Sequence, residues 1–167
     1  MENLELVPLI VRWLHVLAAC LAIGTPLFVR FVLLPAMHKT LDPEAAARVR
    51  GAVNATWRLV VGIMIAVFIL TGIYMFVFIV LPTNLGPYKA AYHALFGLKM
   101  LLALVVFFLA SVLPGRAPAF EFLRKNLKAS LTTLILLLLL ILMFAIALHT
   151  LRDQAMAYQL HQATTQR

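Results

Sequence analysis

Four long apolar segments, separated by short polar ones, dominate the pattern of residues along the chain. A helix needs about 20 mostly apolar residues to cross a bilayer, and each segment meets that length. The segments run over residues 7–36, 56–81, 90–113 and 128–150. The pattern therefore predicts an all-α protein with one domain, residues 1–167, in which four transmembrane helices form a bundle.

The polar stretches between the segments carry turn and capping signals. In Asp42-Pro43-Glu44, an acidic cap precedes a proline suited to the first turn of a helix. We expect residues 43–55 to form a short amphipathic helix that leads into the second span. The segment PTNLGP (82–87) predicts a tight turn, and PGRAP (114–118) predicts the end of the third helix. Residues 151–167 are polar, and we expect them to be a frayed extension of the fourth helix.

The leucine run at 134–142 has no polar face. A helix that is apolar on every side does not need water on any side. We expect this run to face lipid or a partner subunit.

Composition supports a membrane protein. The chain is 64% hydrophobic and 12% charged, whereas soluble domains usually have about 25% charged residues. The net charge of +8 arises from cations that flank the apolar spans, which favours contact with lipid headgroups over binding of nucleic acid. We therefore expect the lipid bilayer as a partner and no nucleic acid.

The distribution of cations predicts the orientation. Lysine and arginine are concentrated in the first and third loops, at Lys39, Arg48, Arg50, Arg116, Arg124 and Lys125. By the positive-inside rule these loops lie in the cytoplasm and both termini lie on the outer, periplasmic side. The acidic start of the chain and the length of its first apolar run favour an uncleaved span over a signal peptide. We expect a multi-pass protein of a bacterial inner membrane.

Several polar side chains fall inside the predicted spans. His15 lies about 12 Å into the first helix and Lys99 about 14 Å into the third, at 1.5 Å per residue. Both helices run in the same direction, so the two side chains should lie at nearly the same depth. Arg12 is one turn from His15, and His93 is almost two turns from Lys99. With His149, three histidines from three helices would converge on the outer half of the bundle.

Lys99 raises a question of charge. A lysine at the centre of a membrane helix costs about 2.5–3.5 kcal/mol on insertion scales, yet none of the four spans contains Asp or Glu. The anion that balances Lys99 would then come from outside the chain, either as the carboxylates of a cofactor or as a lipid phosphate.

The histidines have structural interpretations as well. His15 is equally compatible with a metal-ligand role and with an interhelical hydrogen bond, whereas the positions of His93 and His149 near the interface favour a structural role. Small residues near His15 and Lys99 allow either close helix packing or room for a flat ligand; they are Ala18, Ala19, Ala22, Gly24 and Gly97. Cys20 is the only cysteine, which excludes an internal disulfide, a cysteine-ligated Fe–S cluster and a c-type haem attachment.

Three segments resemble one group of membrane proteins. RWLHVLAACLAIGTPLFVRFVLLPA (12–36) resembles the first helix of the CopD-like and HemJ-like families, in which a histidine opens the helix and a glycine, an aromatic residue and an arginine follow. The corresponding residues here are His15, Gly24, Phe28 and Arg30. TWRLVVGIMIAVFILTGIYM resembles the second helix, with Arg58 near its start, and GLKMLLALVV resembles the third, with Lys99 as its intramembrane lysine.

The resemblance implies a function. HemJ-like proteins are haem b-binding protoporphyrinogen IX oxidases in which the first-helix histidine is implicated in haem binding and the lysine and arginine positions in function. The chain differs from that pattern at two positions. The family has a histidine two residues before the lysine, where this chain has Gly97. The family also has a histidine just after the first-helix arginine, where this chain has the Leu34-Pro35 region. Both differences count against oxidase activity.

The leading hypothesis is a redox or electron-transfer protein, or a porphyrinogen oxidase, that binds haem b in its outer half. His15 would be an axial ligand, and Arg12, Lys99 and His93 would be the available donors to the haem carboxylates. One alternative is CopD-like copper handling, with His15 and His93 as metal ligands. The other is a cofactor-free accessory subunit of a larger membrane complex. A homo-oligomer is also compatible with the sequence.

Overall fold

The computed structural model describes residues 3–165, and in this part of the chain the backbone is helical apart from short connections. The order of elements is α1 (Asn3–Phe28), the π-helical turn η1 (Val29–Leu33), α2 (Leu34–Thr40), α3 (Pro43–Met75), the π-helical turn η2 (Phe76–Val80), η3 (Gly86–Tyr88), α4 (Lys89–Val112), η4 (Pro118–Phe120), α5 (Glu121–Lys125) and α6 (Leu127–Thr165). Four helical segments are long and apolar enough to cross a membrane: Leu6–Thr40, Pro43–Val80, Gly86–Val112 and Leu127–Thr165. The predicted all-α fold with four transmembrane helices is confirmed.

The first span is longer than predicted because the helix continues past Ala36. The π-helical turn η1 joins α1 to α2 without a break, and Leu34 N–H bonds to the Val29 carbonyl, five residues back. Pro35 follows at once, and proline in an ordinary helix lacks a donor and clashes with the preceding turn. The wider π turn accommodates it, so the helix extends to Thr40.

The second span begins at the predicted cap. The Asp42 carboxylate accepts a hydrogen bond from Ala45 N–H at 2.8 Å, and Pro43 occupies the first turn. Beyond this point the structure differs from the expectation, because residues 43–55 are not a separate short helix. They form the first turns of one uninterrupted helix, α3, since no proline follows Pro43 in it and isolated glycines such as Gly51 are tolerated.

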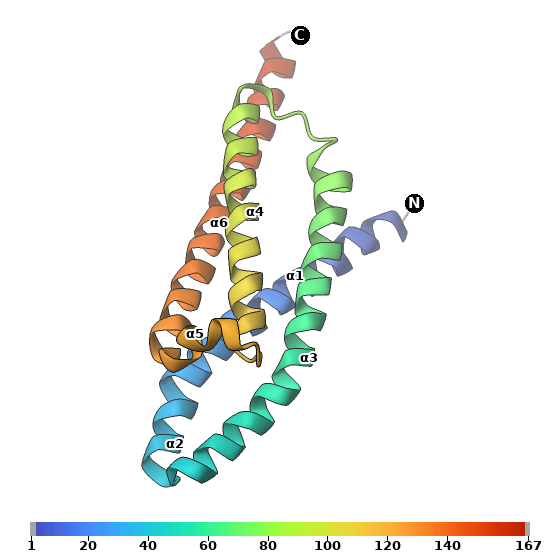
Figure 1. The fold of residues 1–167 in the computed structure, drawn as a ribbon. Helices are drawn as coiled ribbons and strands as arrows, with labels where there is room; N and C mark the ends of the chain where they lie inside the picture. Colours follow the sequence, from blue (N-terminus) through green and yellow to red (C-terminus); the bar gives the residue numbers. More distant parts are fainter. Residues whose placement is uncertain (1–2, 166–167) are drawn as a thin grey trace.

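Helices α4 and α6 form the most closely packed pair, and they lie side by side in Figure 1. Their shared core contains Val106 of α4 and Leu113, which directly follows α4, with Leu131, Leu134 and Leu138 from α6. The expectation that the leucine run faces lipid or a partner was therefore wrong for the buried leucines of α6. Other leucines of the run, Leu136, Leu139 and Leu142, are exposed, as lipid contact requires.

The C-terminal extension is also more ordered than predicted. Helix α6 continues to Thr165 without a break, and Ala155 within this extension is fully buried, at 0% exposure. It packs with Leu85, Tyr92 and Leu148 in a second core cluster. Gln159 Nε2 also donates to the Asn84 carbonyl at 2.7 Å. These contacts hold the extension against the 82–88 turn, so it does not fray.

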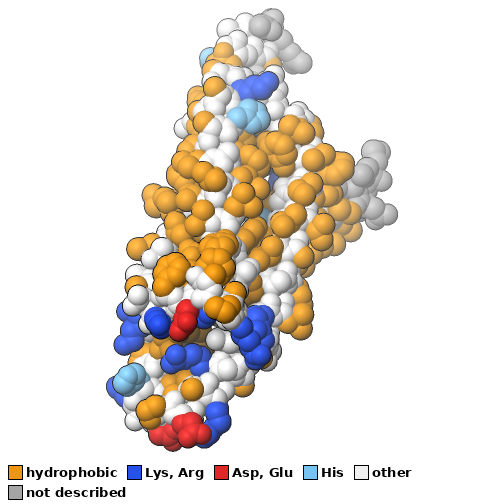
Figure 2. All heavy atoms as spheres, viewed as in Figure 1, with side chains coloured by type: hydrophobic (Ala, Val, Ile, Leu, Met, Phe, Trp, Pro, Cys, Tyr) orange, Lys and Arg blue, Asp and Glu red, His pale blue; other side chains and the backbone are white. Residues whose placement is uncertain are grey.

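Of the remaining helices, α1 packs against α6 and against α3. In Figure 1, α1 crosses the molecule obliquely and α3 diverges from α4 toward the end that carries the 82–88 turn. Only 6% of the residues in the most hydrophobic part of the third span are buried, and 28% of those in the corresponding part of the fourth span are buried. Figure 2 shows the resulting hydrophobic surface along the middle of the molecule, with Lys and Arg gathered at the end where α2 meets α3. The apolar middle is the part that contacts the lipid bilayer of a multi-pass membrane protein.

Candidate cofactor site

A hydrogen bond between two spans occupies the middle of the molecule. His15 on α1 lies with Nδ1 2.7 Å from the Thr71 hydroxyl oxygen on α3. Thr71 is buried, at 6% exposure, because this face of α3 packs against α1. The threonine hydroxyl in turn donates to the carbonyl of Val67, one turn earlier, at 2.6 Å.

These two contacts fix the tautomer of His15. A threonine hydroxyl has one proton and can accept through its lone pairs. The carbonyl of Val67 can only accept, so the Thr71 proton is committed to it. His15 Nδ1 must then carry a proton and donate it to Thr71. The second ring nitrogen, Nε2, is left with a free lone pair, and no hydrogen bond to it occurs within residues 3–165.

Aromatic rings position the imidazole from the other side. The Phe68 ring meets the His15 ring edge-on, with centroids 5.1 Å apart. Phe68 also contacts Phe107 of α4, at 5.9 Å between centroids. A row of three rings, His15, Phe68 and Phe107, therefore joins α1, α3 and α4, with the imidazole at one end.

Lys99 lies on α4, in the middle of the third span. Its side chain is partly buried, and no Asp or Glu of the described chain pairs with it. That it lies at the depth of His15 and close to it stays a prediction. The spans therefore contain an imidazole with a free nitrogen, on α1, and an ammonium group without a carboxylate partner, on α4.

Open space adjoins the small residues of this region. A Cβ atom placed on Gly24, Gly72 or Gly97 would meet no atom within 4 Å outside its own helix. Gly72 directly follows Thr71, and Gly97 is two residues from Lys99. Gly24 and Gly97 are exposed, so the space at these two glycines lies on the outer surface of their helices.

The other outer-half residues remain at the surface. Arg12 and His93 are exposed, and the His93 ring contacts its neighbour Tyr92 with centroids 6.1 Å apart. His149 is also exposed and pairs with Asp153 of its own helix, Nδ1 to Oδ2, at 2.9 Å. The structure therefore does not assemble the three histidines around one centre.

Arg30 and Arg58 lie far from His15. Arg30 is 15 residues along the same helical segment, about 22 Å at 1.5 Å per residue. Its Nε donates to the Lys128 carbonyl at 3.2 Å and lies 3.4 Å from the Thr132 hydroxyl. Arg58 precedes Thr71 by 13 residues on α3, about 20 Å by the same rise. Both arginines lie toward the end where α2 meets α3.

Two features of the site were not predicted from the sequence. Thr71 is one, because a threonine inside an apolar span usually satisfies itself on its own helix and gives no signal of a partner on another. The second is a group of cations where α2 and α3 meet the start of α6. In the sequence, these lysines and arginines indicated only the orientation of the chain in the membrane.

Within residues 3–165, no group of three or more His, Cys, Asp or Glu side chains is arranged to hold a metal ion. A haem requires only one or two protein ligands to its iron, so this finding bears on copper more than on haem. No family model, curated protein or solved structure matches the chain.

Proposed function

We propose that this multi-pass membrane protein binds haem b, with His15 Nε2 as an axial ligand, and takes part in electron transfer in a bacterial inner membrane. The observation that carries the proposal is the His15–Thr71–Val67 hydrogen-bond chain. Histidines that ligate metals commonly donate their other ring N–H to an oxygen, which fixes the tautomer and the ring orientation. The resemblance to HemJ-like proteins supports the same residue.

The residues near His15 are compatible with haem. The chain supplies one imidazole with a free nitrogen and, in Lys99, one partly buried cation that would pair with a haem carboxylate. When bound, the haem would supply one-electron redox chemistry. The role of the chain would be to orient the imidazole, through Thr71 and Phe68, and to exclude water by the apolar helices around it. Porphyrinogen oxidation is the narrower form of this proposal.

The test is an absorption spectrum of protein purified in mild detergent from cells supplied with a haem precursor. We expect a Soret band and haem b by pyridine haemochrome assay, and we expect His15→Ala to lose most of the haem. His149→Ala is the matched control, because His149 is exposed and paired on its own helix, and it should keep its haem. A colourless wild type, or a His15→Ala protein with full haem content, would overturn the proposal.

A cofactor-free subunit role is the second candidate. The observation in its favour is that only 6% to 28% of the most hydrophobic part of each span is buried inside the described chain. Native mass spectrometry of the gently solubilised protein tests it. A stoichiometric complex with a second membrane protein and no haem would support this role, whereas a coloured monomer or homo-oligomer would count against it. Copper handling has no such observation in its favour.

A further inference from the structure

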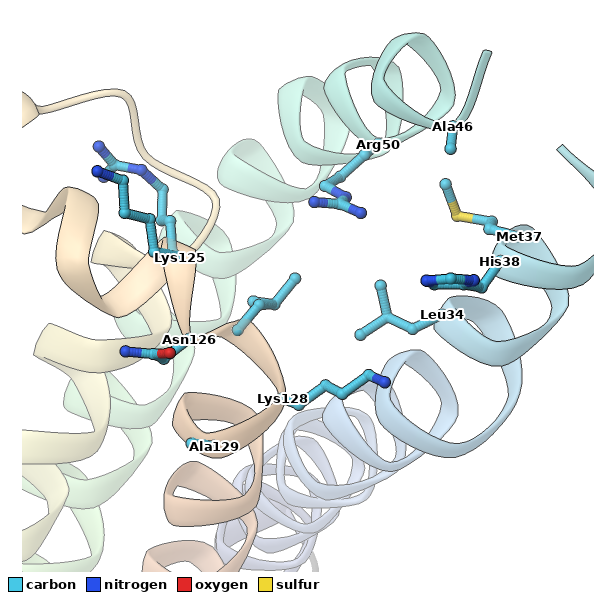
Figure 3. Close-up of a pocket in the computed structure, with 11 residues that line it drawn as sticks. Leu34, Met37, His38, Ala46, Arg50, Lys125, Asn126, Lys128 and Ala129 are labelled. Atoms are coloured by element: carbon cyan, nitrogen blue, oxygen red, sulfur yellow. The ribbon is translucent and has the colours of Figure 1, made fainter. Parts of the chain in front are cut away.

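A second polar site, about 430 Å³ in volume, lies where α2 and the start of α3 approach the α5–α6 junction (Figure 3). We call it the cationic pocket. Its lining consists of Leu34, Met37, His38, Ala46, Arg50, Arg124, Lys125, Asn126, Leu127, Lys128 and Ala129. Figure 3 shows Arg50 extending from α3 and Lys128 extending from α6 toward the space between them.

Positive charge dominates the lining. Four of its side chains are Lys or Arg, and none is Asp or Glu. Lys125 has a carboxylate partner, Glu121, at 3.3 Å, but within residues 3–165 no carboxylate pairs with Arg50, Arg124 or Lys128. Like charges that converge without counter-charges repel one another, so this arrangement is most stable when an anion lies between them.

Arg124 has unused hydrogen-bonding capacity in the pocket wall. Its Nη2 donates to the Ala117 carbonyl at 2.6 Å, whereas its Nη1 is buried and has no hydrogen-bond partner in the structure. A buried donor that lacks a partner is costly. Because Nη1 is buried and Nη2 is bonded to the 114–120 segment, Arg124 contributes its positive charge to the pocket and not a hydrogen bond to a ligand inside it.

The rest of the lining has a different character. Leu34, Met37 and Ala46 form an apolar wall opposite the cations. The pocket lies at the ends of spans one, two and four, close to the level where a bilayer changes from hydrocarbon to headgroups. The combination of several cations, an apolar wall and interfacial depth fits an anion that carries a hydrocarbon part.

We propose that the cationic pocket binds the phosphate group of an anionic phospholipid, with Arg50 and Lys128 around the phosphate, the charge of Arg124 in the wall behind them, and the apolar residues Leu34, Met37 and Ala46 against the acyl chains. The site is separate from the region of His15, because Arg30, which contacts Lys128, is already about 22 Å along the helix from His15. The inference therefore does not depend on haem binding.

The experiment measures lipid binding to the full chain in neutral detergent by native mass spectrometry. The probes are phosphatidylglycerol, phosphatidylcholine and inorganic phosphate as a competitor. We expect phosphatidylglycerol to bind more tightly than phosphatidylcholine. Arg50→Gln and Lys128→Gln should each weaken it about fivefold, since one Lys or Arg near a membrane surface contributes about that factor.

Arg48→Gln is the matched control. Arg48 lies on the same helix as Arg50, carries the same charge and pairs with Glu44 at 2.7 Å outside the pocket. It should leave phosphatidylglycerol binding unchanged, and circular dichroism would confirm that all three variants fold. Competition by inorganic phosphate at millimolar concentration, without a preference for lipid, would support a phosphate site whose ligand is soluble. Equal binding of the two lipids, or equal effects of Arg48→Gln and Arg50→Gln, would overturn the proposal.

Discussion

Two lysines of this chain experience different surroundings, although their side chains are identical. Lys99 lies inside the third span, partly buried, with no carboxylate partner in the described chain. Lys128 lies at the start of α6, exposed, in a pocket with three other cations. In the hydrocarbon region each charge needs a specific partner, whereas at the headgroup level water and lipid phosphates are available. The comparison explains why cations can gather at one end of the molecule while the middle holds very few.

The same contrast applies to hydrogen bonds between helices. The His15–Thr71 bond joins two spans through a threonine that is 6% exposed. The contacts of Arg30 with the Lys128 carbonyl and the Thr132 hydroxyl join spans at the cationic end, where the partners are exposed. Loss of the His15–Thr71 bond leaves the His15 N–H donor without a partner and without access to water. Loss of the Arg30 contacts leaves the Arg30 donor able to bond to water.

The largest expected effect comes from replacing each lysine by methionine. Lys99→Met should make insertion of the third span more favourable by about 2.5–3.5 kcal/mol, because the ammonium group no longer enters hydrocarbon. Lys128→Met should change insertion of the fourth span by less than about 1 kcal/mol, because the position is close to the interface. A glycosylation-based insertion assay on each span measures both values.

Haem content of the same variants sharpens the comparison. If Lys99 pairs with a haem carboxylate, Lys99→Met should contain less haem in spite of its easier insertion, and Lys128→Met should contain as much as the wild type. A Lys99→Met protein that is more stable and retains all its haem would show that Lys99 is not an anchor.

The next effect in size concerns the buried hydrogen bond. Thr71→Val should destabilise the protein by removing the acceptor of His15 Nδ1–H. A double-mutant cycle with His15→Phe should give a coupling energy of about 0.6 kcal/mol, and at most about 1.7 kcal/mol, as interhelical hydrogen bonds in membranes do. Unfolding in mixed micelles measures it. Thr71→Ser keeps the hydroxyl and should keep most of the stability, so a Ser variant as unstable as the Val variant would assign the loss to packing.

The sequence predicted most of the fold because the hydrophobic segments and the Asp42-Pro43 and PTNLGP signals are local. The boundaries it placed wrongly depend on non-local contacts. The extension beyond Thr150 is helical and packed because Ala155 contacts Leu85 and Tyr92. A polar, Gln-rich segment contains no local signal that predicts this contact. The buried side of the leucine run also depends on a non-local contact, its packing against α4. A run with no polar face does not indicate which of its sides makes that contact.

The candidate site was predicted only in part. Equal depth along two helices follows from counting residues, so the sequence alone puts His15 and Lys99 at one level, and their proximity stays a prediction. Thr71 did not, because its partner depends on the rotation of α3 about its axis, which hydrophobic periodicity defines poorly when every side is apolar. Arg12 and His93 were expected near the same centre, but the structure leaves both exposed, because depth alone does not determine which way a side chain points.

The smallest effect is expected at the cationic end. Arg30→Met removes the Nε donor to the Lys128 carbonyl and the contact of the guanidinium with the Phe31 ring, at 5.3 Å from its centroid. Because these partners are exposed, water and lipid headgroups replace the lost contacts, and we expect a destabilisation of about 0.5 kcal/mol or less. Thr132→Val removes only the hydroxyl that Arg30 Nε approaches at 3.4 Å and that bonds within α6, and it leaves the Lys128 carbonyl and the Phe31 ring as partners of Arg30. Unfolding under the conditions used for Thr71→Val allows a direct comparison. A loss at Arg30 as large as that at Thr71 would mean that the end of the bundle is as closed to water as its middle, and the contrast between the two regions would then be wrong.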